Sequence, residues 1–275
     1  MLNCVFIHIF KVLKHLKYMN RAYPTDLTDT QWSAIVHLFD DKRNRKHRLY
    51  ELWNAIFYLL KTGCQWRMLP KEYPKWELVY YYYSKWRDDG TIAEVHEVLR
   101  NELRRQSGKQ ASPSLAIIDS QSSKTSRSGA TNRGIDGGKR VKGRKRHIVV
   151  DSLGLLLVVV VHAANHHDSK AAFSVIEQLR YRFPRLVKII ADAGYRGELA
   201  DKVKRCFGWI LTVVMRKDAK KFEILPQRWI VERTFSWFES YRRLSKDFEY
   251  HTHTQEAMIH LAMIKIMLKD RKSVV

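Results

Sequence analysis

The sequence predicts an α+β protein, in which a helical N-terminal part precedes a mixed β-sheet with helices on its faces. In residues 27–106 the apolar side chains recur at helical spacing, whereas after residue 114 short β-branched runs alternate with helical stretches. The segment 107–114, which contains Gly108 and Pro113, is expected to link the two parts. We therefore expect one domain at 24–110 and another at 111–275, preceded by an N-terminal extension at 1–23 to which we assign no function.

The composition points to a polyanionic partner. The chain of 275 residues carries 50 Lys and Arg against 28 Asp and Glu, a net charge of +22 at pH 7, and its hydrophobic content of 45% excludes wholesale disorder. Three cysteines are too few for a disulfide framework, which favours a cytoplasmic protein. The longest apolar stretch, 155–164, is too short to span a membrane. Nucleic acid is the expected partner, and a merely solvated basic surface is the alternative.

The helical part is read from its apolar stripes. Thr28 or Asp29 can cap a helix at 31–39, and a second helix follows the basic connector 42–48. A structured turn is expected at 62–74, followed by an aromatic-rich helix at 76–87 and a longer one at 91–105. The arrangement is typical of a helix-turn-helix DNA-binding module, and the aromatic side chains are expected mainly in its core.

The sheet part begins with a strand at 115–118 that ends in Asp119. Strands at 147–150 and 155–161 form a hairpin, and a helix at 169–183 precedes a strand at 187–191 that ends in Asp192. A helix at 198–206, a strand at 209–214 and a last helix at 255–268 complete the order. We expect the first and fourth strands to be central neighbours, so that Asp119 and Asp192 lie side by side. Capping of a strand end is the alternative role for either acid alone.

Residues 124–146 combine five glycines with nine basic residues and a single acid, Asp136. This composition predicts a flexible cationic loop that follows a phosphate backbone. Its basic residues are Lys124, Arg127, Arg133, Lys139, Arg140, Lys142, Arg144, Lys145 and Arg146.

A third acid, Glu232, lies in a predicted helix over 227–247. On a helical projection it falls in a narrow polar stripe flanked by Trp229 and Phe235, with Arg228, Ser236, Glu239, Arg243 and Lys246. A solvated helix face would give the same stripe. If Glu232 instead meets Asp119 and Asp192, the three carboxylates can hold two Mg²⁺ ions for an in-line phosphodiester displacement.

Five sequence blocks together resemble a known family. They are LTDTQW (27–32), TGCQWRMLP (62–70), IIDSQS (117–122), ADAGYRG (191–197) and RWIVERTFSWF (228–238). From about residue 24 onward, the chain is similar to bacterial insertion-sequence transposases of the DDE type, in the group named after insertion sequence five. The resemblance implies a helical DNA-binding domain and a ribonuclease-H-like catalytic domain. It also implies a catalytic and metal-binding triad of Asp119, Asp192 and Glu232, with two Mg²⁺ or Mn²⁺ ions per active site.

The resemblance extends to residues that contact DNA. The third catalytic motif of the wider superfamily contains Tyr, Arg, Glu and Lys in that order. Arg228 and Glu232 fit this motif, whereas Leu225 and Glu239 stand where it has Tyr and Lys. Arg228 would orient Glu232 or bind phosphate. Further expected DNA contacts are Tyr195, Arg196, Arg242, Arg243 and Lys246, of which the last three are candidates for the role of the missing Lys.

Three other polar residues, between the third and fourth blocks, are candidates for a role. Asp168 is either an auxiliary acid or, preferably, the cap of the next helix. His166 and His167 lack further ligands at zinc spacing, so no zinc is expected.

The function expected from this resemblance is DNA transposition. The enzyme would cut the terminal inverted repeats of an insertion sequence and join the 3′-hydroxyl ends to target DNA. It would act as a homodimer or larger assembly on DNA, in the bacterial cytoplasm at the nucleoid. The alternatives are a non-catalytic DNA-binding protein, such as a repressor using residues 24–106, and a ribonuclease-H-like nuclease.

Overall fold

The computed structural model describes residues 21–39, 45–126, 130–214 and 227–270, which form two compact units, Met1–Thr91 and Ile92–Val275. Most of the predicted extension at 1–23 lies outside these residues. The units divide at Thr91, before the boundary expected at residue 110, so that the helix after it belongs to the second unit. That helix is tied there by Arg104, which pairs with the buried Asp151, and by Arg100, whose guanidinium lies 5.0 Å from the Phe183 ring.

The first unit is helical, as predicted. Its elements are α2 (Asp29–Ser33), η1 (Val36–Leu38), α3 (Leu49–Thr62), η2 (Trp66–Met68) and α4 (Trp76–Asp88). Thr28 caps α2 in a capping box with Gln31. The helix predicted at 31–39 is divided into α2 and η1, and the β-branched residues Ile35 and Val36 lie at the break.

Aromatic side chains fill the core of this unit. Trp53 and Tyr83 are fully buried, and Trp53 stacks on Trp86 with 5.2 Å between ring centroids. On α4 the buried and exposed tyrosines separate by face: Tyr83 is inside, whereas Tyr80 and Tyr81 are exposed. Trp53, Tyr83 and Trp86 are therefore part of the core, as predicted for most of these aromatic residues. Tyr80 and Tyr81 are not.

The second unit contains the mixed sheet. Its elements are α5 (Thr91–Gln106), β1 (Leu115–Lys124), β2 (Gly134–Asp136), β3 (Val141–Val150), β4 (Leu156–Ala163), α6 (Asp168–Glu177), β5 (Lys188–Ala191), η3 (Ala193–Tyr195), α7 (Leu199–Phe207), β6 (Ile210–Val213), α8 (Trp229–Glu239), α9 (Arg242–Ser245) and α10 (Thr252–Asp270). The strand order is β2-β3-β1-β5-β6, with β4 paired to β3. β1 runs parallel to β5 and antiparallel to β3, so the predicted central pair is confirmed. None of the described helices is both long and apolar enough to span a membrane.

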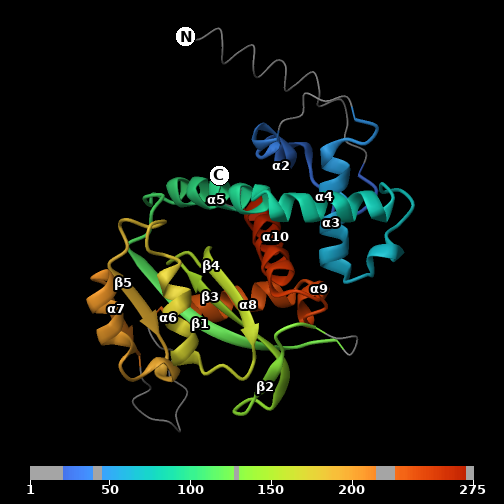
Figure 1. Cartoon of the computed structure of the whole chain (residues 1–275). Coiled ribbons are helices and arrows are strands. Elements are labelled where there is room, and N and C mark those ends of the chain that lie inside the picture. The colour runs from blue at the N-terminus through green and yellow to red at the C-terminus, as the bar shows by residue number, and fades with distance from the viewer. Residues whose placement is uncertain (1–20, 40–44, 127–129, 215–226, 271–275) are drawn as a thin grey trace, which may run out of the picture. The chain divides into compact units, whose positions relative to one another are not determined.

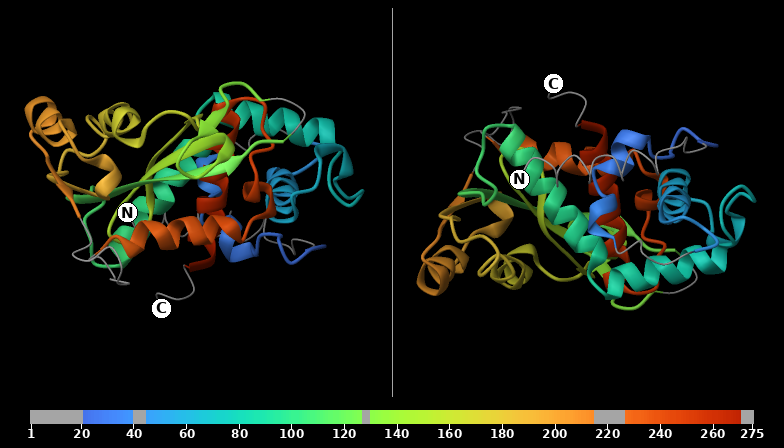
Figure 2. Two further views of the ribbon diagram at one scale, coloured as in Figure 1. Left: turned by 90° about the horizontal axis from the view of Figure 1, so that it is seen from below. Right: turned by 90° about the horizontal axis from the view of Figure 1, so that it is seen from above.

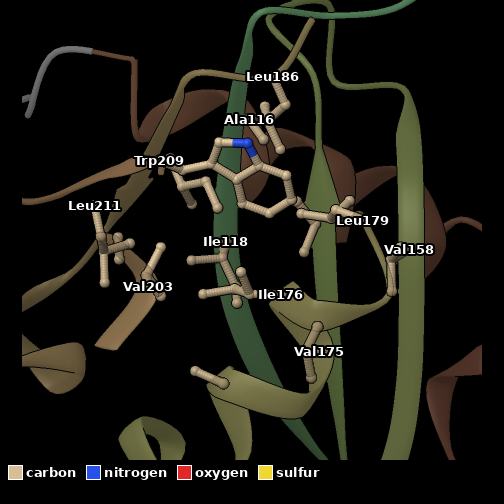
Figure 3. Close-up of a cluster of buried hydrophobic side chains, with 14 of the residues drawn as sticks. Ala116, Ile118, Val158, Val175, Ile176, Leu179, Leu186, Val203, Trp209 and Leu211 are labelled. Carbon is tan, nitrogen blue, oxygen red and sulfur yellow. The ribbon is translucent and has the colours of Figure 1, made fainter. Parts of the chain in front are cut away.

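Helices cover both faces of this sheet, as the sequence predicts. The ribbon shows α6 and α7 on one face and α8 and α10 on the other (Figures 1 and 2). Between the sheet and the α6–α7 layer lies a cluster of buried apolar side chains in which Ile118, Ile176 and Trp209 meet (Figure 3). β1 alternates accordingly: Ile118 faces this cluster, and its odd-numbered neighbours point to the opposite face.

Three sequence expectations are wrong. Residues 124–146 are not a flexible loop: within the described part they contain the β2–β3 hairpin, and β3 already begins at Val141. β1 continues through Asp119 to Lys124, because residues 117–124 pair with β3, so Asp119 lies inside a strand. The single helix expected at 227–247 ends at Glu239, where the chain turns and Tyr241 adopts an extended conformation before α9.

Candidate active site

Strand pairing brings the two aspartates together. Ile117 of β1 is in register with Ile190 of β5, and Asp119 and Asp192 each follow two residues later. Asp119 shares the strand face of Ile117, opposite to the apolar cluster. Asp192 directly follows β5 and caps η3, where its Oδ1 accepts a hydrogen bond of 2.8 Å from the Gly194 amide.

Arg228 joins the third acid to this pair. Its Nη2 atom lies 3.3 Å from Asp192 Oδ2, 3.5 Å from Glu232 Oε1 and 4.0 Å from Asp119 Oδ2. Arg228 is the cap residue of α8, and Glu232 follows it by one helical turn, so both side chains project from the start of that helix. Three carboxylates from two strands and one helix therefore surround a single guanidinium group.

The site is half open to solvent. The Glu232 side chain is 57% exposed, whereas that of Asp119 is 14% exposed. The pKa of Asp119 is raised to about 6, mainly by burial and also by the nearby charge of Asp192. A hydrogen bond of 2.7 Å from the Ser120 amide and the charges of Arg228 and Lys139 act in the opposite direction. Desolvation is thus the main cause of the raised pKa of Asp119.

The donor atoms suit a hard divalent cation, because all three side chains offer carboxylate oxygens. Among the described residues, however, no group of three or more His, Cys, Asp or Glu side chains is arranged to hold a metal ion. The Arg228 guanidinium lies between the acids and supplies the positive charge there. Its Nε atom is buried and has no hydrogen-bond partner in the described part of the chain. The three carboxylates are therefore chemically suited to bind a metal ion. In this structure the Arg228 guanidinium lies where such an ion would bind.

A polar network lies beneath the aspartates. Ser120 Oγ donates to Asp168 Oδ1 at 2.9 Å, and Lys145 Nζ lies 2.8 Å from the same oxygen. Asp168 is the first residue of α6, whereas the cap position is His167, so the structure does not support the expected capping role. Its carboxylate instead connects β1 to β3.

Tyr195 is not on the surface where DNA could contact it. The side chain is 1% exposed, and its hydroxyl lies 2.9 Å from His147 Nε2. His147 Nδ1 lies 2.7 Å from His162 Nε2, and His162 Nδ1 lies 2.9 Å from the Ala163 carbonyl. Since His162 must donate to that carbonyl, His147 donates to His162 and accepts from Tyr195. The neighbouring Arg196 is exposed, as a DNA contact requires.

Six of the nine basic residues of 124–146 fall into two groups; of the other three, Lys124 and Arg133 are exposed and Arg127 lies outside the described residues. Arg144, Lys145 and Arg146 are buried: Arg144 pairs with Asp247 at 2.9 Å, and Arg146 donates to the Leu244 carbonyl at 2.9 Å. These three side chains are held inside the unit, so their predicted contact with DNA is not supported. By contrast, Lys139, Arg140 and Lys142 are exposed on or beside the hairpin turn. Lys139 Nζ lies 3.4 Å from the Ser120 carbonyl, next to Asp119.

The three candidates for the role of the missing Lys, which are Arg242, Arg243 and Lys246, differ in their exposure to solvent. Arg243 is buried and pairs with Glu249 at 2.6 Å, which removes it from the surface. Arg242 and Lys246 are exposed, but they lie beyond the end of α8. Glu239 accepts a hydrogen bond of 3.4 Å from Gln121 Nε2. Leu225 lies outside the described residues.

Sequence reasoning missed the Arg144–Asp247 and Lys145–Asp168 pairs and the Tyr195–His147–His162 chain. Each joins residues far apart in the sequence, and no local pattern indicates them. One signal was available in the length of the hairpin strands. β4 has eight residues, twice as many as the strand expected at 147–150. A hairpin partner as long as β4 would extend that strand back into the basic segment, as the pairing of β3 with β4 shows.

Comparison with known proteins agrees with this geometry. Residues 110–267 match the family model described as "Transposase DDE domain", and residues 27–96 match "Putative transposase of IS4/5 family". A "Putative transposase for insertion sequence element IS402" from Burkholderia cepacia is 30% identical over 133 residues, which cover 45% of this chain and 60% of that protein. The solved structure of a "Mos1 transposase paired-end complex with left transposon end" aligns over 97% of this chain and 90% of its own at 10% identity, with a TM-score of 0.24, which is too low to indicate a common fold. The family match covers more than half of the sequence and contains all three acids of the site: the chain belongs to the transposases with a DDE domain.

Proposed function

We propose that this protein is a transposase that cleaves DNA at the terminal inverted repeats of an insertion sequence and joins the 3′-hydroxyl ends to target DNA. The observation that carries the proposal is the convergence of Asp119, Asp192 and Glu232 within 4.0 Å of one nitrogen atom, in a chain of the DDE family. Binding alone would not require three carboxylates at one place.

Each residue has a role that follows from its position. Asp119 and Asp192, held on two hydrogen-bonded strands, and Glu232, on α8, would hold two Mg²⁺ or Mn²⁺ ions. When bound, such ions activate the attacking oxygen and stabilise the leaving oxygen of a phosphodiester displacement. Arg228 holds the three acids together and, once released from them, can bind a DNA phosphate one helical turn from Glu232. Lys139 places a further positive charge beside Asp119.

DNA is the proposed substrate and partner. The net charge of +22, the exposed Lys139, Arg140 and Lys142 of the hairpin, and Arg196 beside Asp192 support it. We assign the helical unit to recognition of the terminal repeats. Pairing of two element ends requires at least a dimer on DNA. The place of action is the bacterial cytoplasm, at the nucleoid.

Cleavage of a duplex that carries the element's own ends tests the proposal. With Mg²⁺ or Mn²⁺ the protein should cut one strand at the end of the repeat, and Asp119→Asn should lower the rate by about a thousandfold or more because a metal ligand loses its charge. Asp201→Asn, an exposed position on α7, is the matched control and should cut normally.

Three results would contradict the proposal. Normal cleavage by Asp119→Asn would reject the site. Binding without metal-dependent scission would indicate a non-catalytic DNA-binding protein. A preference for RNA–DNA hybrids would indicate a nuclease instead.

A further inference from the structure

The helical unit contains a basic cavity that the proposed catalytic site does not explain. Its volume is about 460 Å³, within the range of pockets that bind small molecules. Four of its lining residues are basic: Arg45, Lys46 and His47, which precede α3, and Lys75, which precedes α4. None of the described residues that line it is acidic.

Two of the basic side chains around this cavity, those of Lys46 and Lys75, have no acidic partner among the described residues. The nearby acid Glu51 is engaged, because its Oε2 accepts from the Arg48 amide at 3.3 Å and contacts His47 at 3.2 Å. Lys46 and Lys75 are exposed and form no ion pair within the described residues. Like charges around one cavity repel one another, and a bound anion relieves that repulsion.

The remainder of the lining is apolar and aromatic: Leu52, Leu78 and Tyr82. The Tyr82 ring packs against Trp86 and against Tyr81, with centroid distances of 5.3 and 5.4 Å. An aromatic ring held by such contacts, in a lining that also contains two leucines, offers a stacking surface for a flat, weakly polar group. The cavity thus combines sites for an anion and for an aromatic ring, which are the two parts of a nucleotide.

We propose that this cavity binds a single unpaired nucleotide, with its phosphate on the basic side chains and its base on Tyr82. The inference rests on the proposed action on DNA, but it assigns a second binding site, outside the carboxylate cluster. A base stacked in a duplex cannot present its face to Tyr82, so the nucleotide must be displaced from the helix or free in solution.

Binding of three probes to the full-length protein tests the inference. They are a fully paired duplex, the same duplex with one extrahelical 2-aminopurine nucleotide, and free dAMP. The bulged duplex should bind about tenfold more tightly than the paired one, and stacking on Tyr82 should quench the 2-aminopurine fluorescence. If dAMP binds as well and competes with the bulge, the cavity accepts the free nucleotide too.

Matched variants connect the effect to the cavity. Lys75→Gln and Tyr82→Leu should each remove the preference for the bulge, whereas Lys71→Gln and Tyr80→Leu, at exposed positions outside the lining, should retain it. Lys75 is at the surface, so its substitution keeps the test valid even if Tyr82→Leu fails to fold. Equal affinity for both duplexes with no dAMP binding, or binding unaffected by Lys75→Gln, would overturn the proposal. Asp119→Asn should retain the preference, which separates failure of this site from failure of the catalytic proposal.

Discussion

The guanidinium of Arg228 places one positive charge where three carboxylates converge. Without it, Asp119, Asp192 and Glu232 would repel one another in a partly desolvated site, and the raised pKa of Asp119 shows the cost of that environment. The same charge must compete with any divalent cation for the same oxygens. At the residue scale, Arg228 therefore controls both the shape of the metal-free site and its affinity for metal.

This competition predicts the effect of Arg228→Gln on metal binding. Removal of the guanidinium charge should raise the affinity for Mn²⁺ in the absence of DNA by about tenfold, while DNA cleavage falls because a phosphate contact is lost. Electron paramagnetic resonance of free Mn²⁺ during a titration measures the affinity. Arg228→Lys should stay closer to the wild type, and Arg205→Gln on α7 should change nothing. Weaker Mn²⁺ binding by Arg228→Gln would show that Arg228 supports the metal site instead of competing with it.

At the scale of elements, charged groups buried between β3, β4 and the C-terminal helices hold the sheet unit together. Arg144 on β3 pairs with Asp247 after α9, and both side chains are 1% exposed. Glu256 of α10 is different: its Oε1 accepts a hydrogen bond of 2.8 Å from the Val161 amide of β4, and burial raises its pKa to about 7. A carboxylate with so high a pKa makes the packing of α10 on β4 sensitive to pH.

Glu256→Gln should reveal this sensitivity. The folded-state pKa lies above the ordinary value of 4.5, so folding disfavours the ionised form, and the contribution of Glu256 to stability should fall as the pH rises from 5 through 7 and then level off. Gln keeps an acceptor for the Val161 amide without a charge, and the variant should be more stable at pH 8 by up to about 3 kcal/mol, with no difference near pH 4.

Urea unfolding across this pH range measures the difference. Glu94→Gln, at an exposed position on α5, is the control. Burial lowers the pKa of His260, one turn from Glu256, to about 4, so His260 adds a pH dependence of opposite sign. Both proteins contain His260, so its contribution cancels in their difference. Parallel pH profiles of wild type and Glu256→Gln would show that Glu256 is ionised without cost.

At the scale of the whole molecule, the excess of positive charge is divided between the interior and the surface. Arg144 and Arg146 contribute to the net charge of +22 but face internal partners, so they cannot release counterions from DNA. The exposed cations of the hairpin can do so. Net charge alone thus overstates the surface that DNA can contact.

The salt dependence of DNA binding tests this division. Lys142→Gln should reduce the slope of log K against log salt by about one, because one phosphate contact is lost, and should leave the free energy of unfolding unchanged. Lys109→Gln, in the segment after α5, is the control and should keep the slope. Fluorescence anisotropy at several salt concentrations gives both values. An unchanged slope in Lys142→Gln would place the DNA away from the hairpin.

The sequence by itself determined the order of the main helices and strands, a helix cap at Thr28 or Asp29, and the pairing of the strands that lead to Asp119 and Asp192, because these depend on local periodicity and on the order of elements. It named the three acids of the site through motif blocks. Only the tertiary structure decided that Arg144 and Tyr195 are buried, that α8 ends at Glu239 and that Arg228 lies among the carboxylates. The physical reason is that a charged or aromatic side chain is buried or exposed according to its partners, and here those partners are often about a hundred residues away in the sequence.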